Sequence, residues 1–206
     1  MTNTHTLQKI VVATDGSLTA RNAATVAIQI AQAEALLIEG LYIVDEPLIL
    51  DPYTDYVEKI GVDPGITSRA SLIKWFEKRG NSALDQLQQQ CASQNVPVVT
   101  KVLLGGIPDV ILEKVDQVSF LALGRRGDRH DAVTDHLGEN FRQIAHHAQV
   151  PLIVGGDKVT PIKRIFLIYD GGQRAEIALR LSLQLTQALS ATLIVGVTDQ
   201  IGRAHV

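Results

Sequence analysis

The sequence predicts an α/β fold, a doubly wound parallel sheet of five strands, followed by a partial second copy of its first strand–helix–strand unit. Short apolar runs alternate with stretches of helical periodicity through residues 9–155, and these runs are continuous rather than alternating. Residues 164–172 also align without gaps on residues 9–17. Continuous apolar strands indicate a sheet covered on both faces, and strand–helix alternation indicates parallel strands joined by right-handed crossovers.

The first strand–helix–strand unit is predicted between residues 10 and 44. Residues 10–13 form a short apolar strand that ends at Thr14-Asp15-Gly16-Ser17. Small and apolar residues then recur at helical spacing, and either Ser17 or Thr19 is available as the N-cap of this helix. A second apolar run, residues 36–44, forms the next strand.

The remaining elements of the first domain continue the alternation. Residues 45–66 hold three prolines and several acids without a clear period, so we expect a long loop. The later elements are a helix with apolar positions from 72 to 91, a strand at 97–104, a helix from Pro108 to about Gln117, a strand at 120–123, a helix at 139–148 and a strand at 151–154. Gly80 inside the first of these helices is expected to mark a close crossing.

The second copy is predicted to be incomplete. Residues 175–185 repeat the helix and residues 191–197 repeat the second strand, which gives domains at 1–156 and 157–206. So small a piece cannot bury enough apolar surface to fold alone. Its first strand and the strand at 152–154 both lie at sheet edges, and unpaired apolar edges favour pairing with another chain. We therefore expect a homodimer.

Composition excludes several classes of protein. The formal net charge of −3, without clustered Lys and Arg, argues against a nucleic-acid partner. The one cysteine, Cys91, excludes an internal disulfide, fits a reducing compartment and is expected to be a small core residue. No stretch is apolar enough to span a membrane, and the N-terminus lacks the order of a signal peptide. We expect a cytoplasmic protein without a membrane partner.

Two strand ends carry the chemistry. Asp15-Gly16-Ser17 follows the first strand, and a glycine loop from Gly124 to Gly138 follows the fourth. Ligands of such sheets lie beyond the carboxyl ends of the strands, where the strand order reverses. Glycines let backbone N–H groups approach phosphate oxygens, and the helix that starts at Gly138-Glu139-Asn140 adds a positive dipole end. If the two strands are neighbours, both features meet in one crevice suited to an anion.

These motifs resemble the universal stress protein family. The resemblance is carried by residues 11–17, the Gly124 to Gly138 loop and Val150-Pro151-Leu152-Ile153-Val154, over residues 8–155 and, in part, 163–199. It implies a sheet of order 3-2-1-4-5 and a regulatory protein that binds ATP without catalytic residues, a tandem-type member with a truncated second domain. The residues that it implies for the nucleotide site, together with Arg126 and Asn140, are Asp15, Ile43, Gly124, Gly127 and Gly138.

Two departures from the family pattern leave alternatives open. Ten residues rather than nine separate Gly127 from Gly138, and Glu139 stands where the family has a hydroxyl or an amide. A carboxylate about 4 Å from a phosphate costs about 4 kcal/mol at an effective dielectric near 20. Arg125 and Arg126 can offset that charge, Glu139 can turn outward as a helix N-terminal acid, or Asn140 can supply the polar contact. Otherwise the protein is a nucleotide-free dimeric scaffold with a degenerate ATP site.

Metal binding and ATP hydrolysis are weaker interpretations. The polar loop carries possible ligands, but we expect it to be solvated and to hold no metal; these ligands are Asp128, His130, Asp131, Asp135 and His136. A slow ATP hydrolase lacks an evident general base, because Asp15 is the one candidate acid in the crevice. Its more plausible role there is to position the nucleotide.

Overall fold

The structure, a computed structural model, describes residues 9–50, 62–63, 65–66, 68–115, 118–126 and 138–198. The chain divides into two compact units, residues 1–159 and residues 160–206.

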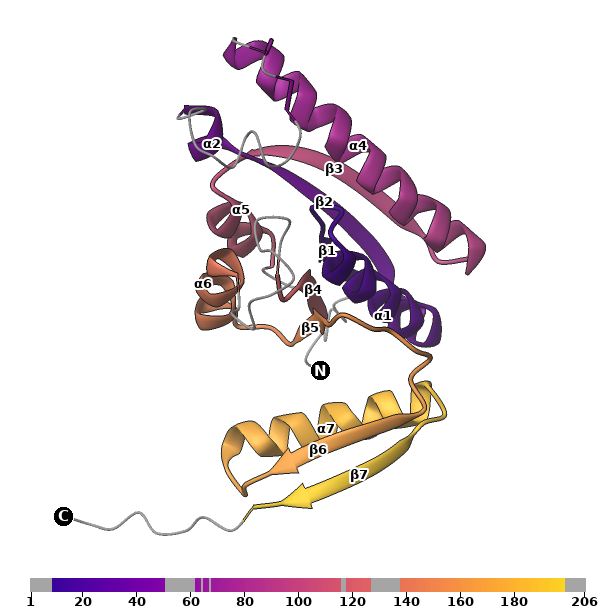
Figure 1. Cartoon of the computed structure of the whole chain (residues 1–206). Helices are drawn as coiled ribbons and strands as arrows, with labels where there is room; N and C mark the ends of the chain where they lie inside the picture. Colours follow the sequence, from indigo (N-terminus) through magenta and orange to yellow (C-terminus); the bar gives the residue numbers. More distant parts are fainter. Residues whose placement is uncertain are drawn as a thin grey trace, which may run out of the picture. The chain divides into compact units, whose positions relative to one another are not determined.

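The first unit is a five-stranded parallel sheet in the order β3-β2-β1-β4-β5 (Figure 1). This confirms the predicted fold class and strand order. Its elements in chain order are β1 (Lys9–Ala13), α1 (Leu18–Glu34), β2 (Leu37–Asp45), α2 (Glu46–Leu50), α4 (Arg69–Ser93), β3 (Val98–Gly105), α5 (Ile107–Lys114), β4 (Phe120–Gly124), α6 (Glu139–His147) and β5 (Leu152–Gly155).

Helices cover both faces of this sheet, with α1 and α4 on one face and α5 and α6 on the other (Figure 1). Right-handed crossovers produce this arrangement, because the chain moves outward from β1 toward β3 and then returns to β4 and β5 on the far side. The core beneath α5 and α6 is built from inward residues of the central strands, such as Val11, Leu41 and Leu121, with Ile111 and Ile144 from the helices.

Helix α1 packs very closely on the carboxyl ends of β4 and β5. Ser17 is its N-cap and accepts a hydrogen bond from the N–H of Ala20. A methyl group placed on Gly155 would lie 2.5 Å from the backbone nitrogen of Ala23 and closer still to the carbonyl oxygen of Thr19. The sequence therefore needs glycine at this strand end so that the helix can reach the sheet.

Helix α4 crosses the sheet over a second glycine. A Cβ on Gly80 would lie 2.7 Å from the Cγ atom of Tyr42 and closer still to Cδ1 of its ring, so the predicted close crossing is confirmed. Cys91 on the same helix is fully buried, and that burial raises the pKa of its thiol to about 11. The prediction that it is a core residue is confirmed.

The loop predicted at residues 45–66 is wrong at its start, where residues 46–50 form the short helix α2. Pro47 is tolerated in the first turn of a helix, because its missing N–H has no intrahelical acceptor there. Ile49 turns inward and is buried. Residues 51–61 and 64 of the predicted loop lie outside the described residues.

One carboxylate is buried within the sheet. Glu39 on β2 is 4% exposed and lies between Lys9 of β1 and Lys101 of β3, whose Nζ atoms are 2.7 and 2.8 Å from its carboxylate oxygens. Desolvation opposes ionisation of Glu39. The hydrogen bonds from Lys101 and Lys9 and their positive charges outweigh it, and the pKa of Glu39 falls below its usual 4.5.

The second unit contains β6 (Arg164–Tyr169), α7 (Gln173–Ala188) and β7 (Thr192–Val197), with the two strands parallel. Its strand-to-helix turn repeats that of the first unit. The side chain of Asp170 accepts from the N–H of Gly172 at 2.9 Å, as Asp15 does from Ser17, and Gly171 has a φ of 77° where Gly16 has 82°. This shared geometry agrees with a partial second copy.

Apolar side chains remain exposed on one face of the second unit. Leu167 is buried, whereas its neighbours Phe166 and Ile168, which point to the opposite face, are 64% and 66% exposed. The ring of Phe166 lies over Gly196 of β7 on that open face. Within the described residues, β6 has one strand neighbour, as expected for an edge strand.

Candidate functional site

The two predicted features leave neighbouring strands of the sheet. β1 pairs with β2 on one side and with β4 on the other, with Val12 opposite Ala122. β1 is therefore the point at which the strand order reverses, where α/β sheets bind their ligands. The turn that carries Asp15 and the loop that begins at Gly124 consequently start side by side at the carboxyl edge.

The turn after β1 is fixed by its own side chains. The Oδ1 atom of Asp15 accepts a hydrogen bond from the N–H of Ser17 at 2.9 Å, and the hydroxyl of Thr14 accepts one from the N–H of Gly16 at 3.1 Å. Gly16 adopts a φ of 82°, which favours glycine. This Asx turn holds the half-buried carboxylate of Asp15 in place at the end of the strand.

The base of the glycine loop is closed by backbone hydrogen bonds. The N–H of Arg125 donates to the carbonyl of Gly155 at 3.3 Å, and the N–H of Gly138 donates to the carbonyl of Arg125 at 3.1 Å. The chain therefore returns at Gly138 to the place where it left the sheet. Gly138 is buried and is the N-cap of α6, so the start of that helix is fixed beside β4.

The same loop is bonded directly to the start of α1. The carbonyl of Arg126 accepts a hydrogen bond from the hydroxyl of Thr19 at 2.5 Å and a longer one from Ser17 at 3.4 Å. Gly124 permits this approach, because a Cβ there would lie 2.5 Å from the Thr19 hydroxyl. The turn after β1 and the loop after β4 are thus joined into one structure.

Two cations of the loop share one carboxylate that sequence reasoning missed. The guanidinium groups of Arg125 and Arg126 lie 2.7 and 2.6 Å from the two oxygens of Asp157. The hydrogen bond from Arg126 and the charges of both arginines lower the pKa of Asp157. Asp157 comes two residues after β5, which is the neighbour of β4. Its position beyond the carboxyl end of β5 is the feature by which the sequence could have indicated it as a site residue.

Ile43 lies within β2, before its end at Asp45, rather than after the strand. The last bond between β1 and β2 runs from the N–H of Thr14 to the carbonyl of Leu41. Because backbone groups two residues apart point to the same side of a strand, those of Ile43 point into the space beyond the end of β1. Its position therefore suits a backbone contact with a ligand in the crevice.

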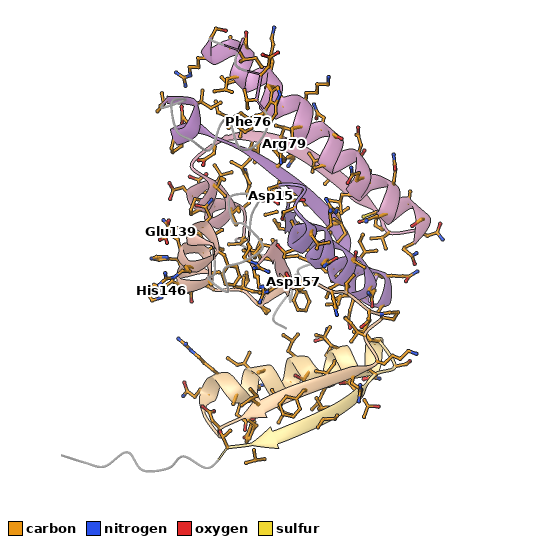
Figure 2. All side chains as sticks on the ribbon, in the orientation of Figure 1. Asp15, Phe76, Arg79, Glu139, His146 and Asp157 are labelled. Carbon is orange, nitrogen blue, oxygen red and sulfur yellow. The ribbon has the colours of Figure 1, made fainter. Side chains whose placement is uncertain are left out.

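The first turn of α6 holds the residues in which the sequence departs from the family pattern. Glu139 is exposed, and Figure 2 shows it on the outer side of α6, away from Asp15. The structure thus favours an outward helix N-terminal acid over a carboxylate that repels a bound phosphate. Asn140, one residue further, is half-buried.

Other predicted positions are outside the described part of the chain. These are Gly127 of the expected nucleotide site and the polar side chains Asp128, His130, Asp131, Asp135 and His136. Within the ranges that the structure does describe, no three His, Cys, Asp or Glu side chains form a group able to hold a metal ion. No helix in those ranges has the length and apolar character needed to cross a membrane.

A groove lies between the start of α1 and the middle of α4. It has a volume of about 410 Å³. Its walls are formed by Asp15, Gly16, Arg21, Trp75, Lys78, Arg79, Ser82, Ala83 and Gln86. Figure 2 labels Asp15 and Arg79, which approach it from the turn after β1 and from α4. Sequence reasoning missed this groove, because the residues of α4 that line it form no motif.

Comparisons with known proteins agree with this fold. A universal stress protein from Archaeoglobus fulgidus has a TM-score of 0.71 at 16% identity, covering 97% of this chain and 70% of that one. A universal stress protein from Lactobacillus plantarum has a TM-score of 0.58 at 21% identity, covering 73% of this chain and 98% of that one. A protein of the same family from Burkholderia pseudomallei has a TM-score of 0.50 at 19% identity, covering 73% of this chain and 96% of that one.

A search of the curated proteins finds no match to the sequence. The model of the universal stress protein family, in contrast, matches residues 6–154, which is most of the chain and nearly all of the first unit. The strand order, the Asx turn after β1 and the closed loop after β4 agree with this match. The chain belongs to the universal stress protein family.

Proposed function

We propose that this protein binds an adenine nucleotide, ATP, in the crevice beyond β1 and β4, and that it acts as a cytoplasmic, regulatory stress-response protein. The observation that carries the proposal is the bond between the hydroxyl of Thr19 and the carbonyl of Arg126. It joins the turn of Asp15 to the base of the glycine loop, so both halves of the expected site are held together before a ligand arrives. Such preorganisation favours binding.

Each residue of the site has a role that suits its chemistry. Asp15 accepts hydrogen bonds and can position the nucleoside, together with the backbone of Ile43. The backbone amides at Gly124, Gly127 and Gly138 and the positive end of α6 are suited to the phosphates. Arg126 and Asn140 lie at the end of the site that would hold the phosphates, where Arg126 supplies a positive charge and Asn140 a polar contact.

We propose a non-catalytic role for this site. Hydrolysis needs a base that reaches the attacking water. Asp15 is the candidate acid, and one of its oxygens already accepts from Ser17 within its own turn. Asp157 is paired with two guanidinium groups. These carboxylates are therefore better suited to hold structure and ligand than to remove a proton.

A nucleotide-free dimeric scaffold is the second candidate, and two observations favour it. The side chains of Arg125 and Arg126 are both paired with Asp157, which reduces the positive charge offered to a phosphate. The second unit also exposes the apolar side chains of Phe166 and Ile168 on an edge strand. A free edge of this kind favours association with another chain.

Mass spectrometry of small molecules released from the purified protein separates the two candidates. We expect adenine nucleotide from the native protein and from an Asp85→Ala variant, in which an exposed acid of α4 is removed. We expect much less from Asp15→Ala. Protein that releases no nucleotide, and that also fails to retain added ATP through gel filtration, supports the scaffold.

A further inference from the structure

The groove between α1 and α4 is lined mainly by one face of α4. Each of Lys78 and Arg79 lies three or four residues from both Trp75 and Ser82, and Gln86 lies four residues after Ser82, so these five side chains project on the same side of the helix. The start of α1 forms the opposite wall. In this wall the side chain of Arg21 donates a hydrogen bond to the carbonyl of Gly16.

The lining carries an excess of positive charge. Three basic side chains, Arg21, Lys78 and Arg79, face a single acid, Asp15. The guanidinium group of Arg79 lies 5.7 Å from the centre of the Trp75 ring, a cation–π contact that holds both side chains in the wall. A volume of about 410 Å³ is within the range of small-molecule sites, and convergent cations recognise phosphate.

The groove meets the proposed nucleotide crevice at Asp15 and Gly16. Both residues belong to the turn after β1, which faces the groove on one side and follows β1 into the crevice. The start of α6 at Gly138 offers backbone donors for one phosphate group, and the cations of α1 and α4 offer donors for another. A nucleotide that binds to both sets of donors needs a negatively charged group at each of two positions on its nucleoside.

We propose that this groove is a second phosphate subsite, and that the preferred ligand is a nucleotide phosphorylated on both its 5′ and its 3′ hydroxyl. The inference rests on the proposed nucleotide function and extends it to the ligand class. The 5′ phosphates lie toward the glycine loop, the sugar lies beside Asp15, and the 3′ phosphate is bound by Arg21, Lys78 and Arg79. An ordinary mononucleotide has no second phosphate that can contact these three side chains.

The test compares adenosine 3′,5′-bisphosphate with adenosine 5′-monophosphate by calorimetry on the full chain. The bisphosphate is expected to bind at least about tenfold more tightly. In Lys78→Gln and Arg79→Gln this advantage falls to about threefold or less, while binding of the monophosphate is unchanged. Lys74→Gln is the matched control, because Lys74 is an exposed lysine of α4 that does not line the groove, and it keeps the full advantage.

Three outcomes overturn the inference, and they differ in what they say of the proposed function. Equal affinity for the two nucleotides, or an advantage that survives both α4 substitutions, removes the second subsite and leaves the crevice intact. Absence of binding for either nucleotide removes the nucleotide function itself, and the inference with it. Circular dichroism of each variant checks its folding, which we expect to be native because Lys78 is a surface residue.

Discussion

The close packing of α1 on the strand ends predicts that Gly155→Ala damages both the fold and the site. The added methyl would lie 2.5 Å from the backbone nitrogen of Ala23 and closer still to the carbonyl of Thr19, whereas Cβ atoms in real proteins essentially never approach within 3.0 Å. Both obstacles are backbone atoms, which cannot rotate away as a side chain can. The helix must therefore move from the sheet by roughly 1 Å, as in other overpacked cores.

The cost follows from what that movement disrupts. Ala20, Ala23 and Ala27 of α1 are buried against the sheet, and the hydroxyl of Thr19 bonds the carbonyl of Arg126. Loosening this contact is expected to destabilise the first unit by about 3 kcal/mol, the upper part of the range for overpacking. For a unit of this size that is roughly 6–12 °C in Tm. ATP binding should weaken too, because the turn of Asp15 and the glycine loop separate.

Gly156→Ala is the matched control. It makes the same chemical change at the next residue, where no atom lies within 4 Å of the new methyl group. Thermal and urea unfolding, followed by circular dichroism, should give a Tm within about 2 °C of the native protein for this variant. If Gly155→Ala unfolds at the same temperature as Gly156→Ala, the reasoning from the tight contact of α1 with β5 is refuted.

Three further predictions concern charge, the thiol and assembly. Glu39→Gln should lower the free energy of unfolding by about 2 kcal/mol at pH 7, because it removes two charge-assisted hydrogen bonds. Since the pKa of Glu39 is lowered in the folded protein, this difference from the native protein should shrink in urea titrations as the pH falls below 4.5. A difference that does not change with pH contradicts this. The thiol of Cys91 should resist iodoacetamide at pH 8 in the native protein and react in urea, because it is buried and its pKa is raised to about 11. Rapid labelling of Cys91 in the native protein contradicts its burial. Sedimentation at micromolar concentration should show a homodimer, since the β5 and β6 edges are unpaired among the described strands, whereas a clean 22.4 kDa monomer contradicts it.

Much of the fold could be predicted from local patterns. The predicted bounds of each strand that the structure describes lie within a residue or two of the observed bounds. The signal was clearest for β1 and β4, whose continuous apolar runs are buried on both faces and have no polar alternation to obscure them. Helix α2 was missed, since five residues are too few for a periodic pattern and Pro47 indicated a loop. The N-cap of α1 could be narrowed only to Ser17 or Thr19, because both carry hydroxyls; in the structure Ser17 caps the helix.

The site was less predictable, since its contacts join residues far apart in the chain. Asp15 and Gly124 were found because each follows a buried strand and fits a family pattern. The pairing of Arg125 and Arg126 with Asp157 depends on β5 lying beside β4. The groove depends on which side of α4 meets α1, and Trp75, Lys78 and Arg79 are ordinary surface residues until that packing is known.

The most direct test of the account is a calorimetric titration of ATP into the native protein, Asp15→Ala and the control Asp85→Ala. We expect saturable binding of one ATP per chain to the native protein and to Asp85→Ala. For Asp15→Ala we expect a loss of affinity of at least about tenfold, about 1.4 kcal/mol. Absence of saturable binding to the native protein, or equal affinity in Asp15→Ala, would contradict a nucleotide site at the carboxyl ends of β1 and β4.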